Sequence, residues 1–149
     1  QPDHGDTLQF RLHQILVIKG AIMARNFSGE WVLERQENFE RLAKQHGVDL
    51  DEKRMIIEQG DDKVKITWGN GVRTFEFNVP GETIMKAGPM EAKWIARWEG
   101  KKLVVTVERS GPAGEGVEPG IITREIVDGK LNVTHEFGGH TATRVFNRA

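Results

Sequence analysis

The stretch Ile122-Thr123-Arg124-Glu125-Ile126-Val127-Asp128-Gly129-Lys130-Leu131 alternates apolar and polar side chains and contains an Asp-Gly pair. Alternation with period two is typical of a β-strand with one buried face, and Asp-Gly between two such runs is a signal for a two-residue hairpin turn. Gly138-Gly139 gives a second turn signal before the last run, residues 140–147. The end of the chain therefore predicts three antiparallel strands joined by tight turns.

Two of these strands carry an arginine between apolar residues on one face: Ile122, Arg124 and Ile126, and Ala142, Arg144 and Phe146. Such an arginine either lies on an exposed face of the sheet or points inward, where its charge needs an anionic partner. No acid shares either face at close spacing, so a ligand could supply the anion. The alternatives are two solvated surface arginines, internal pairing with an acid such as Glu136, or solvation by cavity water.

Short alternating runs continue toward the N-terminus, separated by glycine, proline and acidic turn residues. Ten strands are predicted: residues 29–35, 54–58, 63–68, 72–77, 83–86, 91–98, 102–109, 121–127, 130–137 and 140–147. After the first strand the spacing becomes helical over residues 36–46, with Asn38 near the start and Gly47 after the end. Residues 49–54 allow one further helical turn.

This pattern predicts an all-β fold, a ten-stranded up-and-down antiparallel β-barrel with a short helical lid between the first two strands. A meander of this length closes into a barrel because closure removes its exposed edges. Ten strands enclose more space than side chains can fill, so we expect an internal cavity.

The composition argues against several classes of function. The chain of 149 residues has 21 basic and 22 acidic residues, and a net charge of -1 gives no reason to expect a nucleic-acid partner. Without cysteine there are no disulfides and no thiolate metal sites, and His140 has no partner at metal-ligand spacing. No nucleophile-base-acid set stands out, so we do not expect an enzyme.

Residues 1–22 differ from the rest of the chain. They are polar at first and then apolar, whereas a signal peptide begins with a basic region and has an apolar core that charges do not interrupt. No stretch has the ~20 apolar residues that span a bilayer. Met23-Ala24-Arg25 looks like a natural start. We therefore expect residues 1–22 to be an extension (a leader, a processed remnant or an artificial addition) and residues 23–149 to form the barrel domain. The expected location is the cytoplasm, with secretion left open.

The predicted order of elements resembles the intracellular lipid-binding proteins, the fatty-acid-binding and cellular retinoid-binding family of the calycin superfamily. The residues that carry the resemblance are Phe27-Ser28-Gly29-Glu30-Trp31, Glu37-Asn38-Phe39-Glu40-Arg41-Leu42, residues 123–131 and Thr143-Arg144-Val145-Phe146. It implies that two buried arginines and a tyrosine hold the acidic head group of a ligand. Arg124 and Arg144 match the arginines, whereas Phe146 stands in the position of the tyrosine.

The resemblance also implies which side chains surround the ligand. The expected ligand-binding residues are Arg124, Arg144, Phe146, His135, Trp94, Trp98, Ala96, Ile122, Ile126 and Val133. Trp31 is expected to plug the closed end of the barrel. The second helix of the family is longer than residues 49–54 permit, so the portal for the ligand is expected to differ.

We therefore expect a monomeric carrier that binds a long-chain fatty acid or a retinoic-acid-like ligand and uses no cofactor beyond such a ligand. Transient membrane contact at the portal is the further partner that we expect. Two alternatives stay open. The missing tyrosine hydroxyl and the short lid fit a structural or stress-protective barrel with a hydrated cavity. The inward tryptophans and His135 fit a barrel that binds a pigment, a retinoid or haem.

Overall fold

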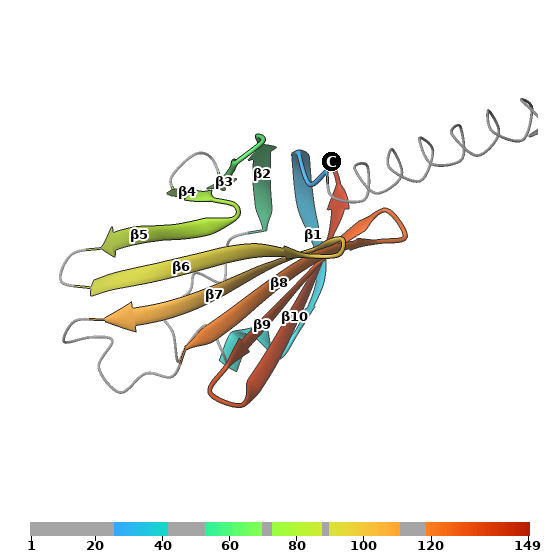
Figure 1. Ribbon diagram of the computed structural model, residues 1–149. Coiled ribbons are helices and arrows are strands. Elements are labelled where there is room, and N and C mark those ends of the chain that lie inside the picture. Colours follow the sequence, from blue (N-terminus) through green and yellow to red (C-terminus); the bar gives the residue numbers. More distant parts are fainter. Residues whose placement is uncertain (1–25, 42–52, 70–72, 88–89, 111–118) are drawn as a thin grey trace, which may run out of the picture.

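The computed structural model describes residues 26–41, 53–69, 73–87, 90–110 and 119–149. These residues form one antiparallel sheet of ten strands (Figure 1). The strands are β1 Gly29–Glu37, β2 Arg54–Gln59, β3 Lys63–Trp68, β4 Arg73–Asn78, β5 Gly81–Ala87, β6 Met90–Glu99, β7 Lys102–Ser110, β8 Gly120–Val127, β9 Lys130–Phe137 and β10 His140–Arg148. Their order in the sheet is β4-β3-β2-β1-β10-β9-β8-β7-β6-β5.

The sheet curls into a nearly closed barrel in which the edge strands β4 and β5 lie beside each other (Figure 1). These two strands share no ladder of backbone hydrogen bonds. They are linked at one end, where the Asn78 backbone N–H donates to Thr83 Oγ1 at 2.9 Å and Asn78 Nδ2 donates to the Glu82 carbonyl at 3.2 Å. The predicted ten-stranded up-and-down barrel is thus confirmed.

The first strand is longer than its sequence pattern predicts. Gln36 and Glu37 belong to β1, because they pair with Arg144 and Thr143 of β10 beyond a register shift at Leu33/Arg35. The prediction of a helix from residue 36 is therefore wrong at its start, and helical structure begins at Phe39. The intervening Asn38 has a φ of 59°, a left-handed conformation that asparagine tolerates well.

Several predicted segments lie outside the described residues. These are the extension over residues 1–22, the remainder of the first helix over residues 42–46, the helical turn up to residue 52, and residues 111–118 of the long loop. Within the described ranges, no helix has the length and apolar character that crossing a bilayer requires.

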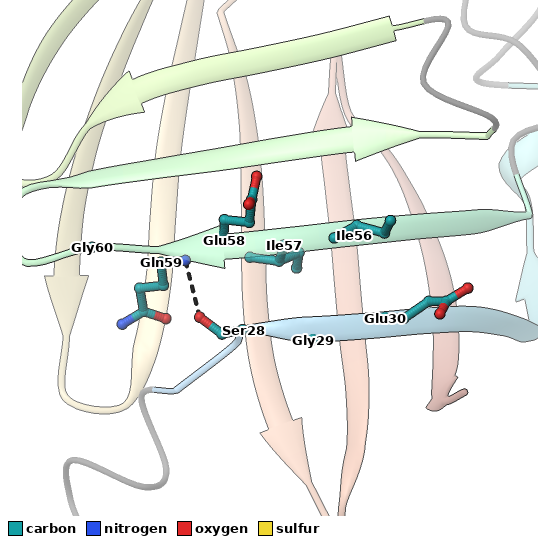
Figure 2. Close-up of a pocket in the computed structure, with 8 residues that line it drawn as sticks. All are labelled: Ser28, Gly29, Glu30, Ile56, Ile57, Glu58, Gln59 and Gly60. Atoms are coloured by element: carbon teal, nitrogen blue, oxygen red, sulfur yellow. Dashed lines mark hydrogen bonds between the residues drawn. The ribbon is translucent and has the colours of Figure 1, made fainter.

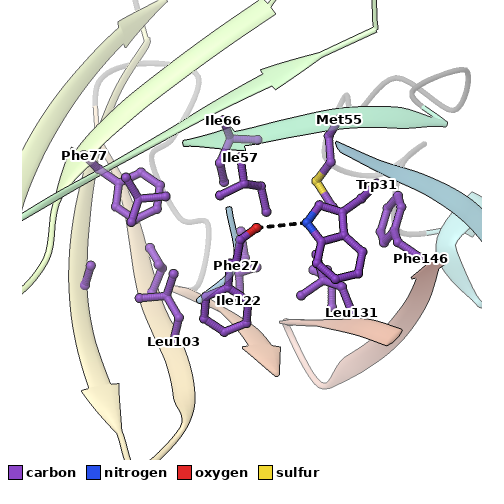
Figure 3. Packing of buried hydrophobic residues seen from close by; sticks show 14 of the residues in the cluster. Phe27, Trp31, Met55, Ile57, Ile66, Phe77, Leu103, Ile122, Leu131 and Phe146 are labelled. Carbon is purple, nitrogen blue, oxygen red and sulfur yellow. Dashed lines mark hydrogen bonds between the residues drawn. The ribbon is translucent and has the colours of Figure 1, made fainter. Parts of the chain in front are cut away.

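One end of the barrel interior is filled by large apolar side chains (Figure 3). Trp31 is completely buried, and its Nε1–H donates to the Phe27 carbonyl at 2.9 Å. The Phe27 ring stacks on Trp98 with a centroid distance of 5.7 Å and an interplanar angle of 4°. We call this region, built around Phe27, Trp31 and Trp98, the closed end. The mouth end is the opposite one, where β4 begins and β5 and β7 end.

Candidate ligand-binding cavity

The register of the sheet places Arg124 and Arg144 in one layer of the barrel interior. Arg124 lies opposite Val133, and Val133 lies opposite Arg144. On the two strands that flank this row, Leu103 of β7 lies opposite Arg124 and Gln36 of β1 lies opposite Arg144. Both arginines are buried, with 4% and 1% of their surface exposed. Their guanidinium groups therefore point into the barrel.

A cavity of about 610 Å³ adjoins this layer. Its volume is in the range of about 300–1,000 Å³ that is usual for small-molecule sites. Five of the predicted ligand-binding residues line it together: Trp94, Ile122, Arg124, His135 and Arg144. Other apolar side chains from distant segments complete the wall, among them Phe39, Ile66, Trp68, Phe75, Met85, Val107 and Phe137.

The other five predicted residues are not among the described residues that line this cavity: Ala96, Trp98, Ile126, Val133 and Phe146. They lie on the inward face of their strands but belong to the packed core or pack against it. Trp98 is taken up by its stack on Phe27, and Phe146 is fully buried with its ring 6.0 Å from that of Trp68. Packed rings thus limit the cavity toward the closed end.

Three aromatic rings surround the Arg144 guanidinium. Its Cζ lies 4.2 Å from the ring centroid of Phe39, 5.3 Å from that of Trp68 and 5.1 Å from that of Phe146. A guanidinium over a ring face is attracted by the negative π surface, most strongly when water is excluded. Phe146 therefore stabilises Arg144 through its ring, where a tyrosine would add a hydroxyl.

The Arg124 guanidinium has different surroundings. Its Nε and Nη1 atoms are buried and have no hydrogen-bond partner among the described residues. Burial lowers the pKa of Arg124 to about 10, so the group stays charged at neutral pH. Buried donors without acceptors cost free energy, which an anionic oxygen placed beside them would recover.

His135 lies next to both arginines, with its ring 5.5 Å from that of Phe39. Burial and, to a smaller extent, the positive charges of Arg124 and Arg144 together lower the pKa of His135 to about 3. The imidazole is therefore neutral at pH 7 and able to donate one hydrogen bond and accept another. Glu136 is exposed on the outer face, so the alternative in which it pairs with the inward arginines is wrong.

Two further arginines on inward positions were missed by the sequence analysis. Arg109 continues the inward alternation of β7, and Arg73 begins that of β4; both line the cavity. No aspartate or glutamate occupies an inward position in the described strands. Glu76, the one acid in the described lining, is on the outer face of β4 and lies 3.8 Å from Lys63. The interior is therefore positively charged.

A second hollow of about 650 Å³ lies outside the barrel along β1 and β2 (Figure 2). Within it the Gln59 backbone N–H donates to Ser28 Oγ at 3.0 Å, and Glu30 pairs with Arg54. It is open to solvent and has no buried charged side chain, so we do not regard it as a ligand site. Among the described residues there is also no group of three or more metal-ligating side chains that could hold an ion.

Comparison with known proteins shows similarity to lipid-binding proteins over most of the chain. No family model matches the sequence. Human cellular retinoic acid-binding protein 2 is 32% identical over 137 residues, which cover 83% of this chain and 98% of that protein. The liver-type fatty acid-binding protein of Epinephelus coioides is 36% identical over 114 residues, which cover 69% of this chain and 82% of that protein. The structure of the fluorescent protein UnaG superimposes with a TM-score of 0.65 at 26% identity, covering 83% of this chain and 97% of that one. The chain therefore belongs to the intracellular lipid-binding protein family.

Proposed function

We propose that this protein binds and carries a hydrophobic ligand with an acidic head group, such as a long-chain fatty acid or a retinoic-acid-like molecule. The observation that carries the proposal is the pair of buried Arg124 donors without a partner among the described residues, beside an apolar cavity. The relatives support the same class of ligand, because one is named as a retinoic acid-binding protein and the other as a fatty acid-binding protein. Both relatives are named as binding proteins, which supports a binding protein rather than an enzyme.

In this proposal most of the affinity comes from the hydrocarbon part of the ligand. Removing apolar surface from water contributes ~25 cal/mol per Å², and Trp94, Ile122 and Val107 offer such a surface. The charged contacts orient the ligand. Arg124 would donate Nε–H and Nη1–H to the carboxylate, and neutral His135 would donate one more hydrogen bond directly or through water. Arg144, held by its three rings, would contribute its positive charge.

Native mass spectrometry of freshly purified protein, followed by extraction and identification of the ligand, tests this proposal. The expected result is a bound species whose mass is that of a long-chain acid. A protein that is empty after purification and does not take up added hexadecanoic acid would contradict the proposal. That result would instead favour the structural barrel with a hydrated cavity.

A pigment is the second candidate ligand, because UnaG is a fluorescent protein and is similar to this chain. The cavity also contains an aromatic group to stack on: the Trp94 ring lies 5.6 Å from that of Phe75 and 5.4 Å from that of Phe77. An absorption band in the visible range for the purified protein would favour this candidate.

The monomeric state, transient membrane contact and the cytoplasmic location stay predictions.

A further inference from the structure

The buried layer of the two arginines contains a third polar side chain, that of Gln36. Gln36 of β1 lies opposite Arg144 of β10, and the row continues through Val133 to Arg124. The Gln36 side chain is half-buried, and its Oε1 atom is buried with no hydrogen-bond partner among the described residues. An amide oxygen is a hydrogen-bond acceptor, whereas the Nε–H and Nη1–H groups of Arg124 are donors. One layer of the interior therefore contains buried donors and a buried acceptor that do not bond to one another.

The inward position of Gln36 results from an irregularity in β1. Leu33 points inward and packs against the core, so strict alternation would place Arg35 inward as well. The register shifts between these two residues, and Arg35 instead pairs with Val145 and is exposed. Gln36 takes the inward position opposite Arg144. Bulges of this kind often redirect a side chain beside a functional site, and here the bulge places an amide where a cation would otherwise lie.

Gln36 lies at the boundary of the cavity. It is not itself among the described residues that line the cavity, but Arg144 opposite it and Phe39 three residues further along the chain both are. Three strand spacings of ~4.8 Å separate Gln36 from Arg124, roughly 14 Å between their Cα atoms along the sheet. Both side chains are long, and the curvature of the barrel brings inward side chains closer together than their Cα atoms. One head group could therefore contact Arg124 and Gln36 at once.

We propose that Gln36 selects a ligand with a hydrogen-bond donor next to its carboxylate, such as the hydroxyl group of a long-chain 2-hydroxy acid. The carboxylate would accept hydrogen bonds from Arg124, and the hydroxyl would donate to Gln36 Oε1. This inference rests on the proposed function, because it needs the acid at Arg124. A plain fatty acid would satisfy Arg124 alone and leave Gln36 Oε1 as a buried acceptor without a donor, which costs free energy. A head group with both an anion and a donor satisfies both side chains.

The test compares three ligands by isothermal titration calorimetry: hexadecanoic acid, 2-hydroxyhexadecanoic acid and 2-methoxyhexadecanoic acid, the last two as separate enantiomers. The methoxy acid keeps the oxygen but has no donor. The wild type should bind one enantiomer of the hydroxy acid about fivefold more tightly than its methoxy analogue, the effect of one net hydrogen bond. Gln36→Met removes the acceptor and keeps the length of the side chain, so it should abolish this preference and change the affinity for hexadecanoic acid less than about twofold. Arg35→Met is the matched control and should keep the preference, since Arg35 is the exposed neighbour of Gln36.

The outcomes separate this inference from the proposed function. A wild type that binds hexadecanoic acid but does not prefer the hydroxy acid to the methoxy acid would overturn the role of Gln36 and leave the proposed function standing. An unchanged preference in Gln36→Met would do the same. An equal loss of affinity for all three acids in Gln36→Met would also overturn it, because Gln36 would then donate its amide N–H to the carboxylate. If the wild type binds none of the acids, the proposed function fails as well.

A measurement without ligand tests the same atom. Gln36→Met replaces a buried acceptor that has no donor by an apolar group, so the Tm of the protein should stay the same or rise. Thermal unfolding of the wild type, Gln36→Met and Arg35→Met measures this effect. A fall of more than about 5 °C in Gln36→Met alone would show that the protein itself satisfies Gln36, and the inference would be wrong.

Discussion

The closed end and the cavity are both lined by the inward residues of alternating strands. They differ in whether their buried polar groups have hydrogen-bond partners. At the closed end, Phe27, Trp31 and Trp98 pack on one another, and the buried indole N–H of Trp31 has an acceptor. Beside the cavity, Arg124 is buried with two N–H groups that have no partner among the described residues. The closed end therefore stabilises the fold. The cavity contains a destabilising buried charge, which is a common cost of a binding site.

The largest effect is expected at the closed end. Trp31→Ala should lower the free energy of unfolding by about 3–5 kcal/mol, because it leaves a large void in a packed region. Urea denaturation monitored by circular dichroism measures this loss. Ile84→Ala is the control, since 50% of Ile84 is exposed and its loss should cost less than about 0.5 kcal/mol. Similar losses for both variants would mean that the closed end is not the main source of stability.

The opposite sign is expected beside the cavity. Arg124→Met removes a buried charge and its unsatisfied donors, so it should raise the free energy of unfolding by about 2 kcal/mol in the absence of ligand. The same urea experiment measures the gain, and the exposed Arg97→Met should change stability by less than about 0.5 kcal/mol. A loss of stability in Arg124→Met would show that the protein itself compensates the Arg124 charge.

Close packing at the mouth end is tested at Gly120. Gly120→Ala should lower the free energy of unfolding by about 1.5 kcal/mol, because the new Cβ collides with the Phe137 ring. Gly60→Ala is a matched control, since its Cβ would meet only the Lys63 carbonyl at an ordinary 3.5 Å. Equal stability of the two variants in thermal unfolding would contradict close packing of the Phe137 ring on Gly120.

The smallest effect concerns the pH dependence of stability. The folded state holds the pKa of His135 at about 3, below the usual value of 6.5, so the unfolded chain binds this proton first as the pH falls. His135 should therefore lower the free energy of unfolding by about 1 kcal/mol between pH 6 and pH 5, and the loss should continue down to about pH 3. Denaturation of wild type and His135→Gln at both pH values measures this effect. The variant should lose less stability on acidification, and identical losses would show that His135 is not held neutral.

The sequence predicts the faces of the strands well but not the depth of each residue. Alternation placed Arg124 and Arg144 each on an apolar face of its strand, and the family resemblance implied that these faces point inward, as it did for Trp98, Val133 and Phe146. Since alternation says nothing about the level along the barrel axis, it could not separate the cavity wall from the packed closed end. Pairing with β10 also extended β1 to Glu37, which no local pattern indicates.

Two features of the cavity were absent from the sequence predictions, the first because it depends on tertiary contacts and the second because the criterion was too narrow. The rings around Arg144 come from Phe39, Trp68 and Phe146, three segments that meet only when the barrel closes. Arg109 was detectable in principle, because it follows Val105 and Val107 on one face. It lacks a second apolar neighbour on that face before the long loop, and so the criterion that singled out Arg124 passed over it.

The central claim is that the cavity end recognises an acid, and the most direct measurement is a cycle of two ligands and two proteins. Dissociation constants for hexadecanoic acid and hexadecan-1-ol are measured on the wild type and on Arg124→Gln, with Arg97→Gln as the control. The account predicts that Arg124→Gln weakens the acid at least about tenfold while the alcohol changes less than about twofold, because only the acid uses the charge-assisted hydrogen bonds. Equal loss for acid and alcohol, or no loss for either, would contradict it.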